Sequence, residues 1–68
     1  MSTEIYLNQL GNPKIAEIKN FNNLPGVGEK IRINTKSYHS SFFEVTDVKK
    51  DINNDTIYLY VNPINNTK

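Results

Sequence analysis

Residues 56–61 of this 68-residue chain read Thr-Ile-Tyr-Leu-Tyr-Val, and this stretch decides the fold. Its aliphatic residues occupy every second position, at Ile57, Leu59 and Val61. A period of two places successive side chains on opposite faces of a β-strand, and β-branched and aromatic residues favour that structure. Pro63 ends the pattern because proline has no N–H to donate. We therefore predict a strand whose aliphatic face points into a core, while Tyr58 and Tyr60 point outward together.

Residues 41–52 predict a second long strand, in which Phe43 and Val45 share one face. Val48 lies out of step with them, because three positions separate it from Val45. A β-bulge inserts one extra residue into a strand and so restores the alternation beyond it. We expect such a bulge near residues 46–47, where it would return Val48 to the inner face.

This bulge makes the two strands complementary. With it, Val48 lies opposite Leu59 and Val45 lies opposite Val61, so two apolar sets meet in register. Asn53-Asn54 is a reasonable two-residue turn between them, because Asn tolerates positive φ better than most residues. The sequence therefore predicts an antiparallel hairpin over residues 41–61.

Three shorter strands precede this hairpin. Residues 30–34 carry Ile31 and Ile33 on one face, and the polar stretch that follows them is expected to be a loop. Residues 4–10 alternate around their aliphatic positions, and residues 11–13 form a turn. Residues 14–21 fit either a return strand or two turns of helix, and we favour the strand because a turn at 11–13 closes a hairpin well.

Five strands in so short a chain most naturally curl into a small antiparallel barrel with little or no helix, which buries one face and protects the edges. We expect one β domain over residues 1–64 and a frayed tail at 65–68. The predicted core consists of Ile5, Leu7, Ile18, Leu24, Val27, Ile31, Ile33, Phe43, Val45, Val48, Ile57, Leu59 and Val61.

Composition narrows the classes of function. The chain has no Cys, one His and a net charge of +1 from eight basic and seven acidic residues, so no disulfide framework, Cys-based zinc site or strongly basic surface is expected. A pocket of ordinary size would remove most of so small a core, and no nucleophile, base and orienting residue stand together. We therefore predict a protein that is not an enzyme and has no cofactor, no metal and no membrane. The N-terminal residues lack the features of a signal peptide, so we expect the protein in the cytoplasm.

Residues 24–31, Leu-Pro-Gly-Val-Gly-Glu-Lys-Ile, resemble the hairpin of the helix-hairpin-helix family of DNA-binding modules. The resemblance implies that backbone amides of Gly26 and Gly28 hold a DNA phosphate, followed by a second helix. Arg32 and Thr35 stand where that helix would need a small and an apolar residue. We favour an irregular loop that leads into a strand near residue 30.

A looser pattern over residues 24–61 is similar to small SH3-like barrel proteins, many of them uncharacterised and from bacterial mobile elements. The matching positions are turn and core positions. The resemblance therefore implies an architecture and an origin in a phage or mobile element, but no ligand.

Two further motifs favour ordinary loops. Residues 51–55 match the opening of an EF-hand calcium loop, but Thr56 stands where the sharp turn needs Gly, and Asn62 where the bidentate Glu belongs. We expect a polar hairpin turn there. His39 is the only histidine, and we expect it to lie in a solvated loop.

The outward residues of the sheet are the best candidates for a binding site. The candidate partner-binding residues are Tyr58, Tyr60, Arg32, Lys30, Glu44 and Tyr38. Tyr and Arg are enriched at binding hot spots, although exposed strand residues with one surface ion pair would look the same. We predict a non-catalytic module that binds a protein partner or a second copy of itself, through this face or the loop 35–41. The alternative is nucleic-acid binding, through bases stacked on the aromatic and basic sheet face or through the Gly26-Val27-Gly28 loop.

Overall fold

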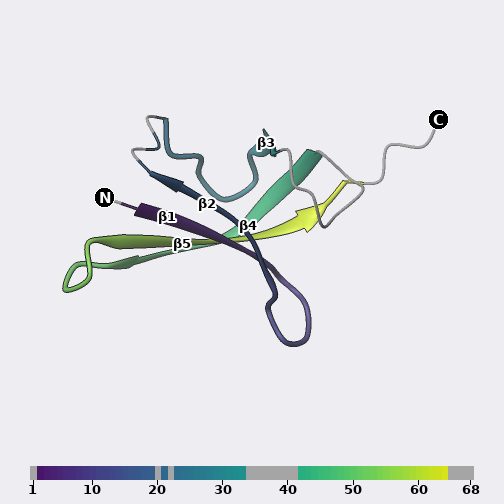
Figure 1. Ribbon diagram of the computed structural model, residues 1–68. Coiled ribbons are helices and arrows are strands. Elements are labelled where there is room, and N and C mark those ends of the chain that lie inside the picture. The colour runs from purple at the N-terminus through teal and green to yellow at the C-terminus, as the bar shows by residue number, and fades with distance from the viewer. Residues whose placement is uncertain (1, 20, 22, 34–41, 65–68) are drawn as a thin grey trace.

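The computed structural model describes residues 2–19, 21, 23–33 and 42–64, and all five strands in this part of the chain belong to one sheet (Figure 1). The strands are β1 (Ser2–Leu7), β2 (Lys14–Lys19), β3 (Lys30–Arg32), β4 (Phe42–Asp51) and β5 (Thr56–Pro63). The sheet has the order β2-β1-β5-β4-β3. No helix occurs among the described residues, so the predicted all-β fold is confirmed.

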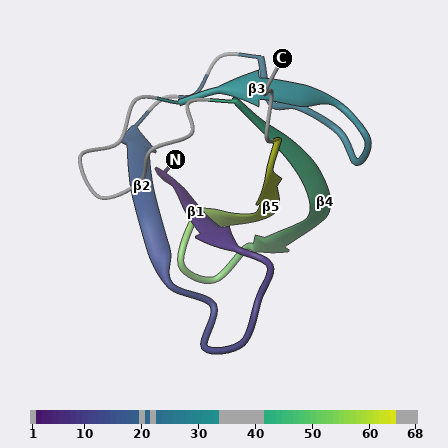
Figure 2. The same cartoon turned by 90° about the vertical axis from the view of Figure 1, so that its right-hand side faces the viewer.

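The sheet curls strongly about its inner face (Figure 2). Its two edge strands, β2 and β3, make no contact with each other, so the curl remains a half-barrel, consistent with a small SH3-like barrel. Three of the four ladders are antiparallel, as predicted, whereas β1 and β5 run parallel. A parallel pair needs a long crossover, which the three intervening strands and their loops supply.

The β4–β5 hairpin has the predicted register. Val45 lies opposite Val61 and Val48 opposite Leu59, and the register shifts between Val45 and Asp47. The bulge at this position is therefore confirmed, and it returns Val48 to the core side.

The turn of this hairpin is longer than the two residues expected. Asp51 pairs with Thr56, which leaves four residues, 52–55, in the loop. The carboxylate of Asp51 accepts hydrogen bonds from the backbone N–H of Asn54 at 3.3 Å and from its side-chain amide at 2.7 Å. Positive φ falls on Asp55, at 52°, and not on an asparagine, because Asp51 fixes the start of the turn.

The N-terminal hairpin settles the choice between strand and helix in favour of strand for β2. Ala16 lies opposite Ile5 in an antiparallel ladder with β1. The turn between the two strands uses positive φ at Gly11 (85°) and Asn12 (41°), and the Asn12 side chain donates a hydrogen bond to the carbonyl of Leu7 at 3.0 Å. The hairpin therefore closes with the residues that tolerate this geometry best.

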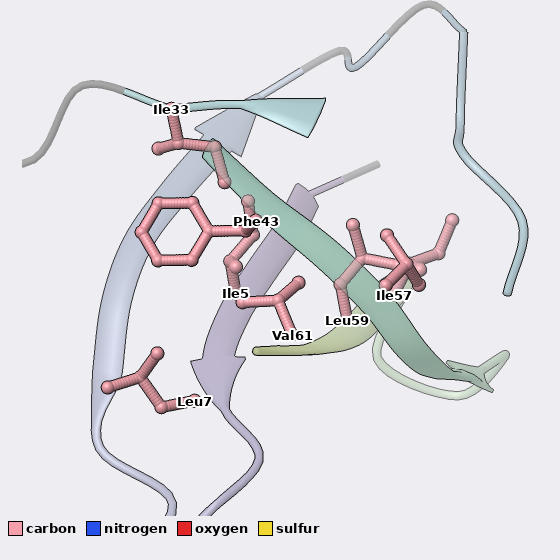
Figure 3. Packing of buried hydrophobic residues seen from close by; sticks show 8 residues of the cluster. Ile5, Leu7, Ile33, Phe43, Ile57, Leu59 and Val61 are labelled. Atoms are coloured by element: carbon pink, nitrogen blue, oxygen red, sulfur yellow. The ribbon is translucent and has the colours of Figure 1, made fainter. Parts of the chain in front are cut away.

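Side chains from four strands or their ends meet inside the curl (Figure 3). The buried hydrophobic residues are Ile5, Leu7, Ile33, Phe43, Val45, Ile57, Leu59 and Val61, all of them predicted. The predicted residues Ile18, Leu24, Ile31 and Val48 pack half-buried against this cluster, together with Ile15, Ala16 and Phe21. Each fully buried aliphatic side chain of this size contributes about 1.5–3 kcal/mol.

Two positions depart from the predicted core. Val27 is 66% exposed, because it lies in the turn that precedes β3 and not in a strand. Thr3 is buried, although it is polar, because the registers of β1 place it between Ile18 and Ile57 on the inner face.

Candidate functional site

Tyr58 and Tyr60 project from the outer face of the sheet, as the alternation predicted. The three aliphatic residues that alternate with them are buried, whereas both tyrosines are half-buried. Each ring therefore keeps part of its surface available to a partner.

A third tyrosine joins them. The parallel ladder between β1 and β5 sets Tyr6 beside Tyr60. The two rings are stacked, with centroids 5.7 Å apart and an interplanar angle of 24°. The ring of Tyr6 also lies 6.2 Å from that of Tyr58, tilted by 52°. These three residues are called the tyrosine cluster below.

Tyr6 was not among the candidate partner-binding residues predicted from the sequence. The alternation around Ile5 and Leu7 already placed it on an outer face. The missing information was the strand order, because only the parallel pairing of β1 with β5 brings Tyr6 to the other two rings.

Charged side chains border the cluster on both sides, in two rows that cross four strands. The registers define one row as Glu17, Glu4, Tyr58 and Lys49 and the other as Lys14, Tyr6, Tyr60 and Asp47. The Lys49 ammonium lies 5.5 Å from the centre of the Tyr60 ring, within the range of a cation–π interaction. Charges of both signs thus border an aromatic centre.

Hydrogen bonds and ion pairs hold the β1–β2 side of this border. The hydroxyl of Tyr6 donates to Glu4 Oε1 at 2.6 Å. This bond, with smaller contributions from desolvation and the charge of Glu4, raises the pKa of Tyr6. Lys14 Nζ lies 2.8 Å from Glu17 and 4.0 Å from Glu4. The hydrogen bond with Lys14 lowers the pKa of Glu17, and the same bond raises the pKa of Lys14.

The bulge fixes the other end of the cluster. Thr46, the extra residue, donates its hydroxyl to the carbonyl of Tyr60 at 3.0 Å. The same hydroxyl accepts a hydrogen bond from the Asn8 side chain at 2.7 Å. The bulge therefore ties β4 to the backbone that carries Tyr60 and to the chain just after β1.

Three of the residues expected beside the tyrosines lie elsewhere. The β3–β4 register sets Lys30 opposite Glu44, and Arg32 opposite Phe42. The guanidinium of Arg32 lies 5.7 Å from the centre of the Phe42 ring, within the range of a cation–π interaction.

Other side chains lie opposite the two tyrosines on the neighbouring strand. Lys49 faces Tyr58 and Asp47 faces Tyr60, whereas Glu44 lies opposite Asn62, beside the Val45–Val61 pair. The remaining candidate, Tyr38, lies outside the described residues, as do the loop 35–41 and His39.

The glycine loop does not have the arrangement that its resemblance implied. The N–H of Gly28 donates to the carbonyl of Val45 at 2.8 Å, and that of Gly26 donates to the carboxylate of Glu29 at 3.2 Å. A strand, β3, follows the loop where the helix-hairpin-helix family has a helix. Both glycine amides are therefore engaged inside the chain and are not presented to a phosphate.

Neither a metal cluster nor a membrane-spanning helix was found in the described part of the chain. No group of three or more His, Asp or Glu side chains is placed there to hold a metal ion. No helix there is long and apolar enough to cross a membrane.

Comparisons with family models, curated proteins and solved structures found no match to this chain. The tyrosine cluster and its charged border therefore rest on geometry alone.

Proposed function

We propose that this protein is a small non-catalytic binding module that docks a protein partner through the tyrosine cluster. The observation that supports it is the gathering of Tyr6, Tyr58 and Tyr60, each partly exposed, at the centre of the outer face. Tyrosine is enriched at binding hot spots because it supplies a large contact area with few rotatable bonds. Stacking in the free protein fixes the rings further, so less conformational entropy remains to be lost on binding.

The charge around the cluster favours a protein over a nucleic acid. Its two rows carry three carboxylates, on Glu4, Glu17 and Asp47, against two ammonium groups, on Lys14 and Lys49. Nucleic-acid binding draws its affinity from neutralised phosphates, which three carboxylates oppose. A rim of both signs around an aromatic centre is the usual composition of a protein–protein interface.

A second copy of the chain is the other form of this proposal. A homodimer through the tyrosine cluster would use the same rings and the same charged border on both sides. We further propose an accessory role in a phage or mobile element, within the bacterial cytoplasm, on the sequence resemblance to barrel proteins of mobile elements.

Single-stranded nucleic acid is the alternative function. The contact of Lys49 with the Tyr60 ring favours it, because a cation beside an exposed aromatic ring is the arrangement that stacks a base and neutralises its phosphate. This alternative predicts oligonucleotide binding at low salt that falls steeply as salt rises and is weakened by Lys49→Glu. Absence of any oligonucleotide binding at low salt would eliminate it.

Photo-crosslinking tests the main proposal. The chain is produced in its source cells with p-benzoylphenylalanine at position 58, and in a matched variant at position 52, where the native Ile is 90% exposed at a hairpin tip. We expect a discrete protein adduct from position 58 that the control does not give, and that disappears when Tyr6 and Tyr60 are both changed to Ala. An adduct of two copies would identify the self-association form. The proposal is wrong if position 58 gives no adduct, or the same adducts as position 52.

A further inference from the structure

The half-barrel leaves two strand edges unpaired in the described part of the chain, one on β2 and one on β3. An unpaired edge presents N–H and C=O groups that can extend the sheet into another chain. The outward residues of β3 are Lys30 and Arg32, whereas β2 carries Lys14, Glu17 and Lys19 in successive outward positions. These charges decide which edges are compatible between two copies.

Pairings that involve β3 place like charges together. Two β3 edges would set Lys30 against the Arg32 of the other copy. If a β3 edge paired with a β2 edge, Lys30 and Arg32 would lie opposite two successive outward residues of β2. One of those two residues is always Lys14 or Lys19. Like charges directly opposite on neighbouring strands are destabilising.

Two β2 edges are self-complementary in one regular register. When Ile18 lies opposite the Ile18 of the second copy, Glu17 lies opposite Lys19 on both sides of it. The ion pairs fall on the outer face, since Glu17 and Lys19 are exposed. Ile18 points to the inner side, where it packs at the border of the core. Opposite charges would also meet in a second alignment of the two edges, with Lys14 opposite Glu17. In that alignment the irregular point of the β1–β2 ladder in one copy would face the same point in the other copy, and regular pairing is interrupted there.

We propose that the chain forms a symmetric dimer through antiparallel pairing of its β2 edges, centred on Ile18, which joins the two sheets into one. This interface shares Glu17 with the charged border but contains none of the three tyrosines, and it does not depend on the function proposed for them. An isologous edge contact closes on itself after two copies, so it leads to a dimer and not to a filament. The contact is small, so the dimer is expected to be weak and to depend on concentration.

Charge reversal tests the pairing. Sedimentation equilibrium over a concentration series should show the mass of the native chain rising from one copy toward two. Glu17→Lys and Lys19→Glu should each weaken dimerisation at least tenfold, because each sets like charges together. An equimolar mixture of these two variants should form a heterodimer, since every outward pair then has opposite signs again. Glu44→Lys, which makes the same charge change on β4, should dimerise like the native chain.

A cysteine placed at the two-fold centre tests the register. The chain has no Cys, so Ile18→Cys introduces the only thiol, which lies opposite its own copy and should form a disulfide dimer under mild oxidation. Ala16→Cys is the control, because the two residues 16 would be four positions apart along the strand, roughly 13 Å. A disulfide needs Cα atoms within about 7 Å.

Circular dichroism confirms that each variant is folded before it is compared. A native chain that stays monomeric at all concentrations, a mixture that fails to restore the dimer, or equal crosslinking at positions 16 and 18 would each overturn the proposal. Loss of the crosslink at position 58 with an intact β2 dimer would instead overturn the proposed function alone.

Discussion

Tyr6 stacks on Tyr60 across the parallel ladder that joins β1 to β5, with the ring centroids 5.7 Å apart. This pair links the first and last strands of the fold on the outer face, opposite the core. The same two rings therefore contribute to stability and form the centre of the proposed binding surface.

The energy of this pair can be measured by a double-mutant cycle. Tyr6→Ala, Tyr60→Ala and the double variant should show a coupling of about 0.5–1.5 kcal/mol in urea unfolding, the range of aromatic pairs. The tilted pair of Tyr6 with Tyr58 serves as a comparison and should couple no more strongly. Additive effects of Tyr6→Ala and Tyr60→Ala would show that the stacking contributes nothing.

The bulge hydroxyl of Thr46 should contribute to stability out of proportion to its size. Thr46→Val keeps the shape but leaves the Tyr60 carbonyl and the Asn8 amide without this partner. We expect a loss of about 1 kcal/mol in the free energy of unfolding, the typical net value of one hydrogen bond. Thr46→Ser, which keeps a hydroxyl, should lose less, and equal losses for the two variants would contradict this role.

Truncation of the core should separate buried from exposed aliphatic residues. Leu59 is fully buried, so Leu59→Ala should cost about 2–5 kcal/mol, and it leaves so small a domain largely unfolded. Val27→Ala, at a position that is 66% exposed, should change stability by less than about 0.5 kcal/mol. Thermal unfolding followed by circular dichroism measures both, and a large effect at Val27 would contradict the position of its loop.

Alkaline pH should weaken the fold through Tyr6. The pKa of Tyr6 is raised in the folded chain, mainly by its hydrogen bond to Glu4. The folded state therefore favours the protonated phenol. Its contribution is complete below the pKa of an unfolded tyrosine and is lost as pH rises through the higher folded pKa.

NMR titration of the Tyr6 ring carbon tests this assignment. Glu4→Gln should bring the Tyr6 pKa down toward its ordinary value, because it removes the carboxylate that accepts the Tyr6 hydrogen bond and also its charge. Glu44→Gln removes a carboxylate far from this ring, so the pKa of Tyr6 should stay raised in this variant. An unchanged Tyr6 titration in Glu4→Gln would refute the cause assigned here.

The C-terminal hairpin was predictable in detail because its information is local. Phe43, Val45 and Val48 can all share the inner face with Leu59 and Val61 only if the two strands pair in one register with one bulge. That register is observed. The buried residues of the core were predictable for the same reason. The two exceptions are Val27, which was expected in the core and is exposed, and Thr3, which was not expected there and is buried. Thr3 is buried by neighbours that lie far away in the sequence, Ile18 and Ile57, whereas Val27 lies in an exposed turn.

The candidate site was predictable only in part. The outward direction of Tyr58 and Tyr60 follows from the period of their own strand. Tyr6 could not be placed beside them, because a parallel pairing between distant segments brings it there. Lys49 and Asp47 follow from the register and the bulge that the sequence predicted, although they were not among the candidate residues. Arg32 was expected beside them from strand order alone, but it lies over Phe42 instead.

The parallel ladder has a consequence for synthesis on the ribosome. β5 lies between β1 and β4, so a nascent chain that lacks it contains only two separate hairpins, and a two-stranded hairpin is marginally stable in water. The backbone ladders that join the two halves of the sheet form only after β5 has left the exit tunnel. The two halves of the sheet therefore join late in synthesis, and the apolar inner face is not fully covered until β5 is in place.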